Sequence, residues 1–250
     1  MTSPLILKKF SLSIDELNNI SEQCRSALLM LGLFVNEANW LRKLLVGAVQ
    51  GISDQAEGQA SFSLAILMAT TLAGKMNSGW IRLNKEKKLL DVINSLEMPQ
   101  ELILLKNKLA IRLASQANIH KIRNDIAFHY PELLEFNKLV GCIEASDAVI
   151  IFSSKEYYGD FLSHISTLAA LEPLLALNNE QDYKVRLKSI LDEIANVAAL
   201  YCQYVIELMV GIINKSIQGG SLEDVCIPDA PEADKVAFQF FMHPPSASDS

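Results

Sequence analysis

The chain has 250 residues, half of them hydrophobic, which is enough for one substantial core and fits one or two domains. Its formal net charge of −7 excludes a protein that coats nucleic acid by bulk attraction, so a nucleic-acid role would need a local basic patch. Aromatic residues (7%), glycines (11) and prolines (8) are sparse, which favours long helices over sheets.

The first helix is predicted to begin at Ser13, because Ser13-Ile14-Asp15-Glu16 has the pattern of a capping box. Apolar residues then recur every three or four positions to about residue 50, which is long for one globular helix and suggests a kink near Gly32. A second helix is predicted over 54–76, interrupted by Asn77-Ser78-Gly79. A third follows over 80–96, and a fourth, opened by Pro99, over 100–115.

The second half of the chain is predicted to be less regular. Pro131 can start a short helix over 131–140, and the β-branched run 147–152 is either a brief strand or an extended loop. Helices are expected over 155–177 and 182–218, the latter ended by Gly219-Gly220. Residues 221–250 hold four of the eight prolines and predict an irregular tail, in which large apolar groups dock on the body or on a partner: Phe238, Phe240, Phe241 and Met242.

Together these elements predict an all-α helical bundle, with one domain over 1–220, an irregular or β insertion over about 141–154 and a tail over 221–250. The four cysteines are far apart: Cys24, Cys142, Cys202 and Cys226. They form no C-x-x-C pair, so we expect free thiols in a reducing compartment. No apolar leader opens the chain, and the apolar stretch 195–214 is broken by Gln203 and Glu207, which predicts a buried helix in a cytoplasmic protein rather than a membrane span.

The sequence has none of the common catalytic motifs, and one stretch combines side chains of the types used in catalysis: residues 123–130, Arg-Asn-Asp-Ile-Ala-Phe-His-Tyr. The guanidinium of Arg123 can clamp a phosphate with two parallel hydrogen bonds, and the imidazole of His129 can exchange a proton near neutral pH. Cleavage of a phosphodiester by its own 2′-hydroxyl needs proton transfer and stabilisation of charge on phosphorus. It needs no metal, so no cofactor is expected.

The stretch resembles the signature of the HEPN superfamily (higher eukaryotes and prokaryotes nucleotide-binding domains), which is Arg, a polar residue, a few further residues and then His. Arg123, Asn124 and His129 match in type and spacing. The wider layout is also similar to helical members of the family, in the segments 35–37, 72–75 and 79–80.

The resemblance implies a helical bundle that acts as a homodimeric, metal-independent endoribonuclease or binds RNA, with a place in a toxin or defence system and an antitoxin or other protein as partner. Arg123 would hold the phosphate, His129 would act in acid–base chemistry and Asn124 would orient or polarise. Supporting candidates are Asp125, Glu37 and Tyr130.

Helix geometry adds a condition. In one continuous helix Arg123 and His129 are about 120° out of register, whereas Asp125 and His129 share a face. Arg123 and His129 therefore meet at one phosphate only if the backbone breaks near Asn124, whose side chain can cap a new turn, or if a partner subunit supplies one of them.

Structural interpretations stay open beside the catalytic one. His129 and Arg123 can instead hold the fold, which would make the protein a non-catalytic helical interaction protein. Asn36 and Glu37 are either a buried polar network or site residues. We expect His120 on the surface and His164 in the core. Two stretches, 82–88 and 106–123, are locally basic, as a solvated helix face or as an RNA-binding patch.

Overall fold

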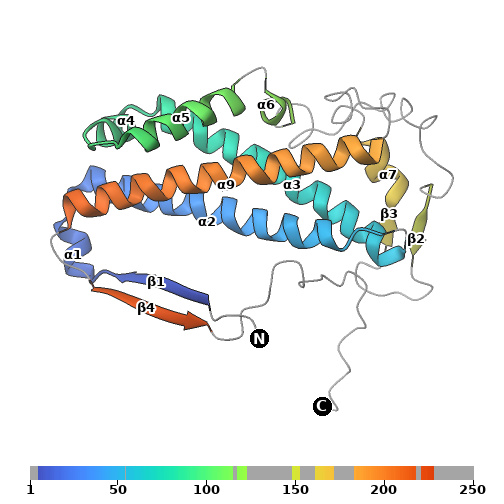
Figure 1. Ribbon diagram of the computed structural model, residues 1–250, viewed down its shortest axis with the longest axis horizontal. Coiled ribbons are helices and arrows are strands. Elements are labelled where there is room, and N and C mark those ends of the chain that lie inside the picture. The colour runs from blue at the N-terminus through green and yellow to red at the C-terminus, as the bar shows by residue number, and fades with distance from the viewer. Residues whose placement is uncertain are drawn as a thin grey trace, which may run out of the picture.

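The computed structural model describes residues 5–53, 55–114, 117–122, 148–152, 161–171, 183–217 and 221–227 (Figure 1). These residues form eight helices and two small two-stranded sheets. The protein is therefore mostly helical, as its composition predicts. The motif at 123–130 and the helix expected over 131–140 lie outside the described residues.

Three long helices form the centre of the bundle: α2 (Glu22–Gln50), α3 (Ala56–Lys85) and α9 (Tyr183–Ser216). Helix α2 packs against α3 and α9, and α3 also packs against α9. The largest side chains that are almost completely buried come from these helices and from the shorter segments around them: Tyr201, Tyr204, Leu31, Leu45, Leu72, Met76, Ile93, Leu109, Ile119, Ile122 and Leu171. One continuous apolar core therefore joins segments that are far apart in the sequence.

The capping box at the start of the first helix is confirmed. In α1 (Ile14–Asn19) the Ser13 hydroxyl accepts from the Glu16 amide at 3.1 Å, and the Ser13 amide donates to the Glu16 carboxylate at 2.7 Å. The predicted kink near Gly32 is wrong, because the helix instead breaks at Ile20, which is extended, and restarts at Ser21, which caps α2. Helix α2 then runs without interruption through Gly32.

The predicted interruption at residues 77–79 is also wrong, because α3 is continuous to Lys85. The chain turns at Glu86, whose backbone is extended, and then forms α4 (Lys87–Asn94). Helix α5 (Gln100–Arg112) follows Pro99, as predicted, and α6 (Asn118–Ile122) is described up to the residue before the motif.

Of the two alternatives for 147–152, the structure has a brief strand. Strand β2 (Ile150–Phe152) pairs antiparallel with β3 (Phe161–Ser163), and α7 (His164–Ala169) follows. The helix predicted from residue 155 is therefore wrong at 161–163, where the backbone bonds to β2 instead of to itself. Helix α9 matches the predicted long helix closely.

The tail is not irregular from residue 221, which corrects the prediction. Strand β4 (Ser221–Ile227) pairs antiparallel over its whole length with β1 (Leu5–Ser11), below the bundle in Figure 1. Two ion pairs accompany the ladder, Lys8 with Asp224 and Lys9 with Glu223. The backbone of this part of the tail is therefore paired with a segment at the other end of the chain.

Helix α9 also satisfies a length and composition test for a membrane span. From Val185 to Ser216 its most apolar window has a mean hydropathy of 1.6, and 44% of that window is buried within the bundle. The buried core helix of a globular protein has the same composition, and α9 packs against α2, α3 and α5.

Candidate functional site

Most of the predicted site residues lie outside the part of the chain that the structure describes: Arg123, Asn124, Asp125, His129 and Tyr130. Whether the guanidinium and the imidazole converge therefore stays a prediction. The structure does describe α6, which leads into the motif, and Glu37, the supporting candidate on α2.

Helix α6 is attached firmly to the bundle. Ile119 and Ile122 are both 0% exposed and belong to the apolar core, and α6 packs against α3. Since Ile122 directly precedes Arg123, the chain enters the motif from a fixed point on the bundle. Truncating a fully buried isoleucine costs about 2–5 kcal/mol, so these two side chains contribute substantially to the packing of α6 on the bundle.

A polar contact lies beneath α6. Asn77 of α3 is only 1% exposed, and its Oδ1 lies 3.4 Å from Nδ1 of His120, which is half-buried rather than on the surface as expected. The Nδ2 of Asn77 has no hydrogen-bond partner among the described residues. A buried amide without a partner is costly, so Asn77 is an unusual polar position in an otherwise apolar face of α3.

A second polar contact joins three helices next to the motif. The Glu193 carboxylate on α9 accepts from Arg112 of α5 at 3.2 Å and from Asn118 of α6 at 3.1 Å. One carboxylate thus fixes the end of α5 and the start of α6 to the central helix. Glu193 was not predicted as a site residue, since no local sequence pattern marks it.

Glu37 is neither isolated nor buried. Its carboxylate forms an ion pair at 2.7 Å with Lys75 of α3, and both side chains are partly exposed (34% and 45%). Asn36 is exposed, so a buried polar network at 36–37 is excluded. Two of the three segments outside the motif whose layout is similar to that of the family, 35–37 and 72–75, are thus in contact.

Buried titratable groups on α9 adjoin this pair. Burial raises the pKa of Tyr201, and the nearby Cys202 and Glu37 raise it further. Burial also raises the pKa of Tyr204 to about 12 and raises that of the Cys202 thiol, which Arg42 opposes. These groups stay neutral near pH 7 and are structural. His164 is buried as expected, with its ring edge-on to Phe62 at 5.1 Å.

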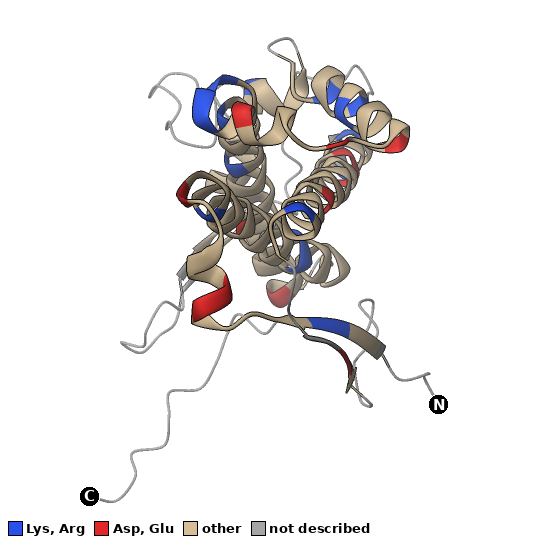
Figure 2. Ribbon diagram, turned by 90° about the vertical axis from the view of Figure 1, so that its left-hand side faces the viewer, with Lys and Arg blue, Asp and Glu red and all other residues tan. Residues whose placement is uncertain are grey.

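The basic residues of the two predicted stretches are mostly exposed. Lys108, Arg112 and Lys121 lie on α5 and α6, the two helices that precede the motif in the sequence, and Arg112 forms an ion pair with Glu193. Lys108 and Lys121 have no ion pair with the other described residues. In Figure 2 the helices of the bundle carry both basic and acidic residues.

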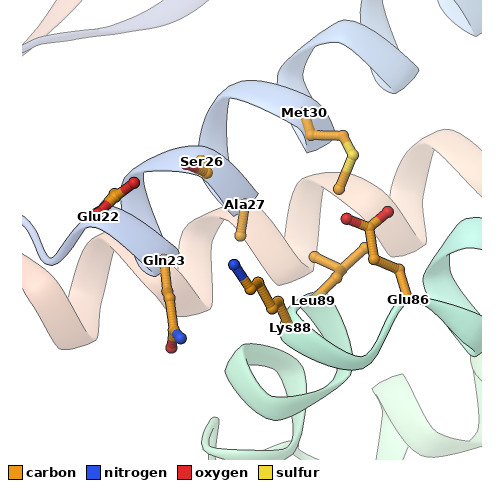
Figure 3. A pocket seen from close by; sticks show the side chains of 8 residues that line it. All are labelled: Glu22, Gln23, Ser26, Ala27, Met30, Glu86, Lys88 and Leu89. Atoms are coloured by element: carbon orange, nitrogen blue, oxygen red, sulfur yellow. The ribbon is translucent and has the colours of Figure 1, made fainter.

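The described residues also enclose a pocket of about 180 Å³ between the start of α2 and the junction of α3 with α4 (Figure 3). Glu22 and Glu86 line it with carboxylates and Lys88 with an ammonium group. Leu89 lines it from α4. Glu37, the predicted site residue that the structure describes, does not line this pocket.

Among the described residues, no three His, Cys, Asp or Glu side chains lie close enough together to hold a metal ion. No protein-family model, no curated protein and no solved structure matches the chain.

Proposed function

We propose that this protein is a HEPN-like, metal-independent endoribonuclease of the cytoplasm. The observation that carries the proposal is the motif itself, in which a permanently charged guanidinium, a carboxamide and an imidazole occur within seven residues, 123–129. These side chains provide the two contributions that internal phosphodiester cleavage needs, namely stabilisation of charge on the phosphate and proton transfer.

In this proposal Arg123 binds a non-bridging phosphate oxygen pair, since a guanidinium offers two parallel donors. His129 removes the proton of the 2′-hydroxyl or protonates the leaving 5′-oxygen, and Asn124 orients the phosphate or the imidazole. A homodimer would bring a second motif to the same substrate, and the cell would need an antitoxin or another partner protein to restrain such an activity.

The described surroundings of the motif are compatible with this role. The mostly helical bundle agrees with the fold that the resemblance implies. The buried Ile122 gives Arg123 a fixed starting point, which a preorganised site requires, because misplacement of a catalytic group by about 1 Å can cost a hundredfold in rate. Exposed Lys121 precedes Arg123 by two residues and adds positive charge there, which favours a polyanionic substrate although the chain as a whole is acidic.

The test is cleavage of a mixed-sequence RNA in EDTA by wild type, Arg123→Ala and His129→Ala. We expect either substitution to lower the rate by about 10²–10⁴-fold, the usual contribution of a positioned acid–base or charge-stabilising group. Arg25→Ala is the matched control, because Arg25 is a partly exposed arginine on α2 that lies outside both basic stretches and donates to Asn18 at 3.4 Å, and it should cleave like wild type. Equal cleavage by all variants, or cleavage that requires a divalent metal, contradicts the proposal.

The second candidate is a non-catalytic helical interaction protein. It is favoured by the large apolar side chains that several helices expose, such as Trp40 on α2 (65%) and Ile111 on α5 (74%). In that case Arg123 holds the fold, and Arg123→Ala should lower the melting temperature by several degrees, at about 2–4 °C per kcal/mol for a chain of this size. A variant that is inactive but as stable as wild type therefore favours the nuclease, and one that is merely less stable favours the interaction protein.

A further inference from the structure

The outward side of the α2–α9 pair exposes a group of large apolar side chains, which we call the α2–α9 patch. Three members come from α2 and two from α9, and each is between 41% and 65% exposed: Leu29, Leu33, Trp40, Ile206 and Val210. The outward stripe of a bundle helix is normally polar, and large apolar side chains that gather on it mark a contact surface.

The packing of the two helices places all five residues on one surface. Gly32 faces Met209 across the pair, because a Cβ at Gly32 would lie 3.6 Å from the end of the Met209 side chain. At about 100° per residue, the α2 members are turned by about 60–100° from Gly32, and the α9 members by the same angle and in the same sense from Met209. In an antiparallel pair, equal turns in the same sense point to the same side.

The two helices are antiparallel, as the colours of Figure 1 show, and the nearby Glu37 and Tyr201 agree with this direction. Leu29 therefore lies within about one helical turn of the height of Val210, and Leu33 within one turn of Ile206. The five side chains thus form one continuous patch that spans both helices.

We propose that the occupant of this patch is the aromatic segment of the same chain, residues 238–242, Phe-Gln-Phe-Phe-Met. Three phenylalanines and a methionine within five residues match the aromatic and aliphatic character of the patch. Aromatic rings pack favourably on one another and on thioethers, and the exposed ring of Trp40 offers such a contact.

The length of the chain allows this contact. Strand β4 starts five residues after α9 ends and runs back below α2 in Figure 1, so it returns towards the patch. From its last residue, Ile227, eleven residues lead to Phe238, which is roughly 36 Å of extended chain. Leu29 and Trp40 are only about 17 Å apart along α2. A tether of this kind gives the segment an effective concentration of about millimolar, so it competes well with separate molecules for the patch.

Charge favours one direction of docking. The stretch 228–237, which leads to the aromatic segment, holds three acidic residues and one lysine. Lys43 lies at the Trp40 end of the patch, with its Nζ 5.3 Å from the centre of the Trp40 ring, whereas Glu207 follows Ile206 on α9. The acidic stretch is therefore attracted to the Trp40 end, where Phe238 would dock first. No motif residue takes part, so the inference is independent of the nuclease proposal.

Trp40 is a built-in probe of the patch. The chain has two tryptophans, and the other one, Trp80, is only 8% exposed in the core. Acrylamide quenching of the full-length chain, compared in each background with and without Trp40→Phe, therefore isolates the quenching constant of Trp40. A docked aromatic segment covers most of the ring and protects it.

The double variant Phe240→Ser/Phe241→Ser should raise the quenching constant of Trp40 about threefold, because the segment loses two of its aromatic contacts. Leu33→Glu should have the same effect from the side of the patch. Both variants should keep the circular dichroism of wild type. Phe10→Ser is the matched control, because Phe10 is a 37% exposed phenylalanine on β1, and it should leave Trp40 protected.

Three results would overturn the inference. One is a wild-type Trp40 that is quenched as readily as in the double variant. Another is an equal increase caused by Phe10→Ser, since the effect would then not depend on the aromatic segment. The last is protection that appears only as the concentration rises from about 1 to 100 µM, because the patch would then be covered by a second molecule.

Discussion

Gly79→Ala tests the packing of the central helices. Gly79 lies within α3, and a Cβ added to it would overlap the hydroxyl of Tyr201 on α9 and lie 3.2 Å from the Cζ atom of the same ring. Tyr201 is 1% exposed and cannot swing into solvent. Alanine gains about 1 kcal/mol of helix propensity over glycine, whereas overpacking of a core costs about 1–3 kcal/mol. We therefore expect a net loss of up to about 2 kcal/mol, or up to about 8 °C in melting temperature.

Tyr201→Phe should remove most of that penalty. Without the hydroxyl, the closest contact of the added methyl group is the ring carbon at 3.2 Å, which a shift of a few tenths of an ångström relieves. In the Tyr201→Phe background, Gly79→Ala should be neutral or stabilise by up to about 1 kcal/mol, which gives a coupling free energy of about 1–3 kcal/mol. The assay is urea unfolding followed by circular dichroism.

Gly211→Ala provides the control for this cycle. Gly211 is a helical glycine on α9 whose added Cβ would meet the side chain of Leu96, with Cδ1 closest at 3.2 Å, and this is the end of a flexible side chain. Its substitution should be neutral or stabilising in both backgrounds. The reasoning is refuted if Gly79→Ala stabilises the wild type, or if the penalty is the same with and without the Tyr201 hydroxyl.

Three further predictions concern side chains around the same core. Because the pKa of Tyr204 is raised to about 12 by burial, its contribution to stability is complete below pH 10 and is lost at about 1.4 kcal/mol per pH unit as pH rises from 10 towards 12. Tyr204→Phe should flatten this loss, as measured by the urea midpoint between about pH 9 and 11; an unchanged slope contradicts it. Glu37→Gln should cost no more than about 1 kcal/mol, since its pair with Lys75 is partly exposed, and the cost should shrink in high salt. Cys226 is exposed and Cys202 is buried with a raised pKa, so Cys226→Ser should remove one fast-reacting thiol in an Ellman titration and Cys202→Ala none.

The start of a helix can be predicted from the sequence when the atoms that cap it belong to neighbouring residues. Ser13 and Glu16 cap each other, and the long period of α9 needs no tertiary information. The break between α1 and α2 escapes prediction, because the apolar spacing continues through it. Ser21 carries the signal that is available, since its hydroxyl accepts from the Cys24 amide at 3.4 Å and caps α2.

Two glycines mislead the prediction because their role depends on a distant helix. Gly32 suggests a kink, but a Cβ there would meet the end of Met209 on α9 at 3.6 Å within a continuous helix. Gly79 suggests a helix break, but its lack of a side chain leaves room for the Tyr201 ring. Both glycines face α9, which lies more than a hundred residues further along the chain, so no local pattern could separate a break from a close approach.

The β1–β4 sheet escapes prediction for a related reason. Neither strand alternates clearly between apolar and polar residues, and the two are separated by almost the whole chain. The usable signal is charge: Lys8 and Lys9 face Asp224 and Glu223 in an antiparallel register. Opposite charges directly across a ladder stabilise pairing, but only a comparison of the two ends of the chain would find them.

The polar surroundings of the motif could be predicted only in part. Asn77 is recognisable as a polar residue at an inner position of α3, between Ala73 and Trp80, although its local sequence suggests a helix break. Its contact with His120 and the bridge made by Glu193 depend on how α3, α6 and α9 are placed, which the sequence does not specify locally.

The segment that carries the motif is attached to α3 at both ends. Its start is held where His120 contacts Asn77, and the chain returns where Thr167 of α7 contacts Ser63 at 3.1 Å. These two points on α3 are fourteen residues, or roughly 21 Å, apart, a distance that about seven extended residues can span. The chain from residue 123 to residue 160 is far longer than this connection needs. Connectivity alone therefore does not account for the length of the segment, of which β2 pairs with β3. Comparing the stability and the cleavage rate of Arg123→Ala distinguishes a structural from a chemical role of the motif.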